Sequence, residues 1–278
     1  MQSVLKEKPA GVNQSMQTDP VVIVGSGPVG VQSLKELYRL SPQQAIVIYG
    51  DEAYVPYNRV RLSGLLSGQF SLSDIETDLS CTSEPHIIQR QHTRVIQIHT
   101  DKHSVIDDQG VEQPYSSLIL ATGSRPHVPN IQNIHLPGVF RFRDMADVQA
   151  LMARQARSRN IVILGGGLLG LEAAHAMQRH NSNVIVIDHM DRLMPQQLDE
   201  DGAELLREHI LRLGIQVVLS DRVAEIIGEE KIQAVRLQSG RVIECDTMIL
   251  SAGIRSNIEL ARDAGVVVGQ GIKVDNTM

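Results

Sequence analysis

Three glycines and one later acid are the residues whose spacing in this sequence points to chemistry. Gly165, Gly167 and Gly170 follow the apolar run Ile161–Leu164 in the order G-x-G-x-x-G. Asp188 ends the next apolar run, about 20 residues later, as in dinucleotide-binding βαβ units. Glycines allow a tight turn and let a pyrophosphate approach the N–H groups of the following helix, while the acid binds ribose hydroxyls. This stretch is therefore predicted to bind a dinucleotide.

A second copy of this motif lies near the start of the chain. Gly25, Gly27 and Gly30 follow the apolar run Val21–Val24, and Asp51 stands about 20 residues after the last of them. Two copies indicate either two nucleotides or one dinucleotide and a decayed site. Because both copies keep all three glycines and the acid, we expect two ligands.

The residues around Asp188 bear on which coenzyme the second site takes. A carboxylate here suits an unmodified ribose and repels a 2′-phosphate, and only Arg192, several positions on, carries a compensating charge. NADH is therefore preferred over NADPH. Glu172, in the early part of the helix after Gly170, is either a partner for the helix dipole or a group near the reacting ends of the two nucleotides.

Composition excludes several classes of function. The chain has 278 residues, a net charge of -6 and a pI near 5.9, which argues against nucleic acid or an anionic membrane as partner. It lacks a long apolar span and a secretory signal, so we expect a soluble, cytoplasmic protein with a flexible tail at residues 1–19. Cys81 and Cys245 form no C-x-x-C pair, and the spacing of the histidines fits no zinc site, so no metal is expected.

Hydrophobic periodicity places these motifs on strands and helices. Around the first motif we expect the strands Val21–Val24, Ala45–Tyr49 and Ser117–Thr122, the helix Pro28–Leu40, and a hairpin of Thr93–Ile98 with Lys102–Ile106. Around the second we expect helices at Asp144–Arg157 and Asp199–Leu213, strands at Ile215–Leu219 and Thr247–Leu250, and a meander of Arg222–Ile227, Ile232–Leu237 and Val242–Glu244. The stretch 53–90 has poor periodicity. It is either a surface loop with a short amphipathic helix or a ligand-contacting loop.

Several longer motifs carry a family resemblance. They are VVIVGSGPVG, PYNRVRLS, LILATGSRP, VILGGGLLGLEAA, DRLMPQQLD and DTMILSAGIRSN, and they span about Val21 to Met278. The chain resembles the pyridine-nucleotide–disulfide reductase superfamily in its cysteine-free branch. It is most similar to rubredoxin and ferredoxin reductases and to the flavoprotein part of NAD(P)H nitrite reductase large subunits.

The resemblance implies an α/β fold with two Rossmann-like domains, the second inserted in the first and each with a small β-meander. An FAD domain would comprise residues 20–140 and 254–278, and an NAD domain residues 141–253. FAD would be contacted by Gly25, Ser26, Gly27, Pro28, Gly30, Asp51, Glu52, Val95, Ala121, Thr122 and Gly123. NADH would be contacted by Gly165, Gly167, Leu168, Leu169, Gly170, Asp188 and Gly253.

The resemblance also implies a reaction. Hydride would pass from NADH to FAD and electrons onward to a protein acceptor, such as an iron–sulfur or rubredoxin-type protein or a nitrite-reducing module. Arg59 and Glu172 match a basic residue near the flavin and its glutamate partner, and we expect them to pair. No cysteine precedes Cys81, which argues against a disulfide mechanism, and the family's next flavin-binding segment lies beyond Met278, so we expect a C-terminally truncated chain. The alternatives are an NADH-binding module without flavin turnover and an NADH oxidase or peroxidase using Cys81.

Overall fold

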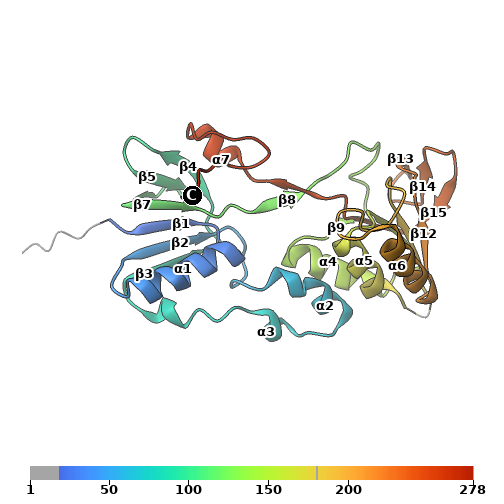
Figure 1. Ribbon diagram of the computed structural model, residues 1–278, viewed down its shortest axis with the longest axis horizontal. Helices are drawn as coiled ribbons and strands as arrows, with labels where there is room; N and C mark the ends of the chain where they lie inside the picture. Colours follow the sequence, from blue (N-terminus) through green and yellow to red (C-terminus); the bar gives the residue numbers. More distant parts are fainter. Residues whose placement is uncertain (1–18, 180, 278) are drawn as a thin grey trace, which may run out of the picture.

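The first unit of the protein is a parallel sheet covered on both faces. A computed structural model describes residues 19–179 and 181–277, so the expected tail at 1–19 lies almost wholly outside the described residues. The sheet has the order β3-β2-β1-β7. Helix α1 covers one face and an antiparallel meander, β4-β5-β6, covers the other (Figure 1). The bounds are β1 Val21–Val24, α1 Pro28–Leu40, β2 Ile46–Gly50, β3 Ile87–Gln91, β4 Val95–His99, β5 Ser104–Asp107, β6 Glu112–Pro114 and β7 Ser117–Leu120.

The second unit repeats this plan with a larger sheet. Its parallel strands have the order β12-β11-β10-β16-β9, with helices α4, α5 and α6 on one face and the meander β13-β14-β15 on the other (Figure 1). The bounds are β9 Val139–Arg141, α4 Met145–Gln155, β10 Asn160–Leu164, α5 Leu168–Met177, β11 Asn183–Ile187, α6 Glu200–Arg212, β12 Ile215–Val218, β13 Val223–Ile227, β14 Ala234–Leu237, β15 Val242–Glu244 and β16 Thr247–Leu250.

Two central strands, β1 and β16, are buried along their whole length because both faces of each sheet are covered. All four residues of β1 and all four of β16 are buried. This is the pattern of parallel strands that lie between two layers, whereas a half-exposed strand would alternate apolar and polar residues. The predicted α/β fold with two meander-bearing units is confirmed.

The segment 53–79, which we call the arm, leaves the first unit and packs against the second. It contains η1 (Arg59–Arg61), α2 (Leu62–Ser67) and α3 (Leu72–Ile75). Tyr57, Leu66 and Ile75 are buried in the same apolar cluster as residues of α4 and α5, and Figure 1 shows α2 beneath these helices. The short helix of the first alternative is present, and the apolar side chains of the arm complete the core of the second unit, so this stretch is more than a surface loop.

Two short strands carry the chain between the units. β8 (Ser124–Pro126) enters the second unit and β17 (Ile254–Ser256) leaves it, and the two pair antiparallel, with Ser124 opposite Ser256. They run side by side between the two units in Figure 1. The chain then returns to the first unit through α7 (Glu259–Asp263), where Leu260 packs against the first sheet and its meander. The second unit is therefore inserted in the first, as predicted, while the domain boundaries remain a prediction.

Strands β8, β9 and β3 depart from the sequence prediction. Pro126, Pro129 and Pro137 predict a linker, yet β8 pairs with β17 and β9 adds an edge strand to the second sheet. β3 lies in the stretch of poor periodicity and has a polar-rich sequence, IIQRQ, which suits an edge strand. Within residues 19–179 and 181–277, no helix is long and apolar enough to cross a membrane.

Candidate dinucleotide-binding sites

The first glycine of each motif makes a turn that no other residue fits. Gly25 has a φ of +112° and Gly165 a φ of +118°, a region that side chains rarely adopt. A Cβ on Gly25 would lie 2.1 Å from the carbonyl oxygen of Ala121, and one on Gly165 would lie 2.3 Å from that of Ser251. Ala121 and Ser251 come directly after β7 and β16, the strands that flank the motif strands. The two turns are thus built in the same way.

The second glycine of each motif leaves space for a ligand, and the third allows the helix to pack closely on the turn, as the motif predicts. A Cβ on Gly30 or Gly170 would lie 1.8 or 2.0 Å from the carbonyl oxygen of the first glycine of its motif, so these positions need close packing of helix on turn. A Cβ on Gly167 would have nothing within 4 Å, and one on Gly27 would meet only the Nε of Arg59, at 4.0 Å. The backbone at the second glycine is therefore open to a pyrophosphate.

The helices that follow the two turns have no side-chain cap. Gly27 is the N-cap residue of α1 and Gly167 that of α5, and neither provides a side-chain hydrogen bond to its helix. By contrast, Asp144 caps α4 by accepting from Asp147 N, and Asp199 caps α6 by accepting from Gly202 N. Unsatisfied N–H groups at a helix N-terminus attract anions. Open glycines and uncapped helices together fit a dinucleotide pyrophosphate at each turn.

The two acids that follow the motifs have different surroundings. Asp188 is buried, and its carboxylate accepts hydrogen bonds from Gly166 N and, at 2.8 Å, from Met190 N. Asp51 is exposed and lies 3.3 Å from Arg94 Nη2. The second acid therefore also braces its glycine turn, whereas the first does not.

Arg59 lies at the first glycine turn but does not pair with Glu172 as expected. Its guanidinium bonds instead to Glu52, at the end of β2, and donates to Arg143 O at 3.4 Å. It also lies 5.3 Å from the centre of the Tyr57 ring. Glu52 precedes Arg59 by seven residues, and the short loop between them brings its carboxylate to the guanidinium. Glu172, half-buried on α5, forms no ion pair with any residue that the structure describes.

Tyr57 and Arg143, which sequence reasoning missed, join the units beside Arg59. The Tyr57 hydroxyl donates to Glu52 Oε2 at 2.6 Å and accepts from Met145 N, at the start of α4, at 3.0 Å. Burial, then this bond to Glu52, raise the pKa of Tyr57 well above its usual range. Arg143 donates to Ser124 Oγ at 2.6 Å, and burial, followed by the nearby Arg59, lowers its pKa. In the sequence, Tyr57 stands out only as part of the PYNRVRLS motif.

The other predicted contact residues lie near the turns or in the elements that lead to them. The Ser26 side chain packs against Gly50, because a Cβ built on Gly50 would lie 2.1 Å from Ser26 Oγ. Pro28 and Leu168 are the exposed first residues of α1 and α5, and Leu169 follows. Ala121, Thr122 and Gly123 follow β7, Gly253 follows β16 with a φ of +95°, and Val95 is buried in the meander.

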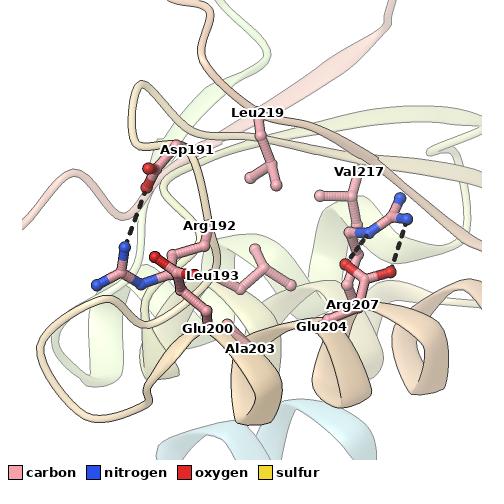
Figure 2. Close-up of a pocket in the computed structure, with 9 residues that line it drawn as sticks. All are labelled: Asp191, Arg192, Leu193, Glu200, Ala203, Glu204, Arg207, Val217 and Leu219. Carbon is pink, nitrogen blue, oxygen red and sulfur yellow. Dashed lines mark hydrogen bonds and ion pairs between the residues drawn. The ribbon is translucent and has the colours of Figure 1, made fainter.

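A cavity of about 410 Å³ lies beside the loop that follows Asp188, and one of its lining residues, Leu193, packs against the second glycine turn at Gly166. Figure 2 shows it between the loop after β11, the first turns of α6 and the end of β12. Its charged groups are largely paired with one another: Arg192 with Asp191 at 3.5 Å, and Arg207 with Glu204 at 2.9 Å. The lining residues are Asp191, Arg192, Leu193, Glu200, Ala203, Glu204, Arg207, Val217 and Leu219.

Neither cysteine lies at a glycine turn. Cys81, in η2 (Ser80–Ser83), packs beside Ile87 at the start of β3. The start of β3 lies at the amino ends of the parallel strands, whereas the turn at Gly25 follows the carboxyl end of β1. Cys245 is buried, and burial raises the pKa of its thiol to about 12. Among the described residues, no group of three or more His, Cys, Asp or Glu side chains could hold a metal ion.

Comparison with known proteins agrees with this architecture. The chain is 36% identical to the assimilatory nitrate reductase electron transfer subunit of Bacillus subtilis, over 95% of this chain and 34% of the relative. It is 38% identical to the nitrite reductase [NAD(P)H] large subunit of Klebsiella oxytoca, over 93% of this chain and 28% of that protein. The chain thus spans about a third of the length of these curated relatives.

Solved structures share the fold. A ferredoxin reductase of Rhodopseudomonas palustris matches with a TM-score of 0.87 and 25% identity, over 92% of this chain and 64% of that one. The putidaredoxin reductase–putidaredoxin complex matches with a TM-score of 0.86 and 25% identity, over 91% of this chain and 63% of the other.

A family model for pyridine nucleotide-disulphide oxidoreductases matches residues 19–278, which is nearly the whole chain. The names of relatives include NAD(P)H, NADH and NAD(+). These coenzymes are dinucleotides, which fits the glycine turns. The chain therefore belongs to the pyridine nucleotide-disulphide oxidoreductase family.

Proposed function

We propose that this chain is the FAD- and NADH-binding part of an electron-transfer reductase, with FAD in the first unit and NADH in the second. The observation that carries the proposal is the pair of open glycine turns, each leading into a helix without a side-chain cap. Bound FAD would accept hydride from NADH and release electrons singly to an acceptor. We keep as part of the proposal the domain limits expected from the sequence, residues 20–140 with 254–278 for FAD and 141–253 for NADH, although β9 (Val139–Arg141) pairs with the second sheet.

The side chains at the turns support binding and orientation. Arg59, next to Gly27, supplies a fixed positive charge for the dinucleotide of the first unit. Glu172 supplies a carboxylate in the second turn of α5, and Asp188 holds the turn that receives NADH. We retain Arg59 and Glu172 as the residues that orient the reacting rings, without the direct ion pair between them.

The relatives support a protein acceptor of electrons. Their names include an electron transfer subunit, nitrite reductases, a reductase for a nitric oxide reductase flavorubredoxin and the ferredoxin reductase component of a dioxygenase system. We infer an iron–sulfur or rubredoxin-type protein, or an attached nitrite-reducing module, as the acceptor of this chain. The site of action proposed is the cytoplasm, where NADH is available.

Anaerobic addition of NADH to the purified chain tests this function. We expect a yellow protein whose flavin absorbance bleaches on mixing, because hydride reduces the flavin. A chain that holds added FAD but is not bleached by NADH would contradict the proposal. A colourless chain that binds NADH but takes up no added FAD would support the alternative, a nucleotide-binding module without flavin turnover.

The cysteines test the other alternative, an oxidase or peroxidase with a redox thiol. We expect Cys81→Ser and Cys245→Ser each to leave the rate of flavin bleaching and the rate of NADH turnover unchanged, because neither thiol lies at a glycine turn. Stopped-flow absorbance under nitrogen and steady-state NADH consumption measure the two rates. Loss of turnover in the Cys81 variant alone, with folding intact, would favour the thiol mechanism.

A further inference from the structure

The meander of the second unit ends in a strand whose outer edge is free. β15 pairs with β14, and no other strand that the structure describes pairs with it. On the side of β14, Arg241 O accepts from Leu237 N. Successive residues of an antiparallel strand direct their backbone groups to alternate sides. The N–H and C=O groups of Val242 and Glu244 therefore point away from β14.

The meander of the first unit shows how such an edge is blocked. Its last strand, β6, pairs with β5 in the same way, and Val111 O accepts from Asp107 N. The residues of β6 that face outward are then Glu112 and Pro114. Proline has no N–H group, so it blocks an edge against a further strand. The second meander has Glu244 at the corresponding position, and its N–H group remains available to a partner.

A cavity of about 300 Å³ lies between β15 and the amino ends of β10, β11 and β12. The parallel strands contribute three amide side chains to its lining, those of Asn160, Asn183 and Gln216. Asn183 Nδ2 donates to Asn160 Oδ1 at 3.0 Å, which holds two of these amides side by side. Apolar surface is added by Ile185 and by Val242, which is 48% exposed. Amides can both donate to and accept from a peptide backbone, so this lining suits an extended chain.

The charges at this end of the second unit are mainly positive, although the chain has a net charge of -6. Arg241 lines the cavity, and Arg157 and Arg159 lie in the loop that leads into β10. All three are exposed, and none forms an ion pair with a residue that the structure describes. Glu244 is the acid in the lining, while Asp246 nearby already accepts from two backbone N–H groups, including that of Arg159. This balance of charge favours carboxylates on the segment that binds here.

We propose that the free edge of β15 binds an extended acidic segment of a partner protein, which adds a strand to the meander. Backbone hydrogen bonds to Val242 and Glu244 would supply affinity, and carboxylates facing Arg241 and Arg159 would supply specificity. The cavity lies at the amino ends of the strands, whereas the turn at Gly165 follows the carboxyl end of β10. The bound segment therefore leaves the dinucleotide sites open. This inference goes beyond the proposed function and does not depend on it.

Calorimetric titration of the whole chain with a capped peptide of alternating glutamate and valine tests the proposal. We expect this peptide to bind, and a peptide with lysine in place of glutamate to bind about tenfold more weakly or not at all. Glu244→Pro is expected to weaken binding of the acidic peptide about tenfold relative to Glu244→Gln. Both variants remove the carboxylate, but only proline removes the outward N–H group. Circular dichroism and urea unfolding establish that both variants are folded.

Two charge variants and one exchange measurement complete the design. Arg241→Gln is expected to weaken binding of the acidic peptide about threefold. Arg222→Gln removes an exposed arginine beside β13, the other edge strand of the meander, and is expected to leave binding unchanged. If Glu244→Pro does not fold, hydrogen exchange of the unchanged chain decides, because the bound peptide is expected to slow exchange at Val242 and Glu244. Absence of binding, equal binding of the lysine peptide, or no slowing of exchange at these two residues would overturn the inference. Equal affinity of folded Glu244→Pro and Glu244→Gln would overturn it as well.

Discussion

Gly165→Ala is expected to lower the free energy of unfolding of the second unit by about 3 kcal/mol or more and to abolish NADH binding. The substitution would force a side chain onto a backbone with φ +118° and place its Cβ 2.3 Å from Ser251 O. Ser251 comes directly after a fully buried strand, so the carbonyl has no room to move. Urea unfolding followed by circular dichroism, with calorimetry for NADH, measures both effects.

Gly240→Ala is the matched control for this substitution. Gly240 has a φ of +89° in a meander turn, but a Cβ there would meet nothing within 4 Å. It isolates the cost of the left-handed backbone, about 1 kcal/mol, from the cost of the overlap. If the two variants lose equal stability and both keep NADH, the overlap at Ser251 is not what makes this position a glycine.

Asp188→Asn is expected to weaken NADH binding more than tenfold and to lower the free energy of unfolding by about 2 kcal/mol. The carboxylate accepts hydrogen bonds from N–H groups on both sides, at Gly166 and Met190. An amide has one acceptor and one donor end, so one of these N–H groups would face an NH₂ group. Calorimetry for NADH and urea unfolding again provide the measurements.

Asp51→Asn serves as the control in the first unit. Asp51 is exposed, and among the described residues its side chain bonds only to the exposed Arg94, so stability is expected to stay within about 0.5 kcal/mol. Equal losses in the two variants would show that bracing of the glycine turn does not distinguish Asp188 from Asp51.

The glycine turns and the strands that lead to them could be predicted because each is specified locally. Val21–Val24 and the run ending at Leu164 are unbroken apolar segments that stop at glycine, and the glycine spacing then predicts a turn and a helix. The helix Pro28–Leu40 was predicted with the same bounds that the structure shows. Local sequence, short turns and regular periodicity all favour one structure here.

The arm and the pairing of Arg59 could not be predicted for the opposite reason. Leu62, Leu66 and Ile75 have irregular spacing, and they are buried only because α4 and α5, encoded much later, provide the opposing surface. The resemblance pairs Arg59 with Glu172, whereas its bond to Glu52 depends on where the arm leaves the first sheet. β8 and β17, each three residues long, pair only across the inserted unit.

The arm has a consequence for the order in which the protein forms during synthesis. All four strands of the first sheet precede the second unit in the chain, so this sheet can close while later residues are still being made. The apolar side chains of the arm emerge at the same early time, but α4 and α5, which cover them, do not. At about 5–20 residues per second, the ribosome leaves Leu66 and its neighbours without their partners for several seconds. We therefore expect the nascent chain to expose its most aggregation-prone surface in the interval before α5 appears.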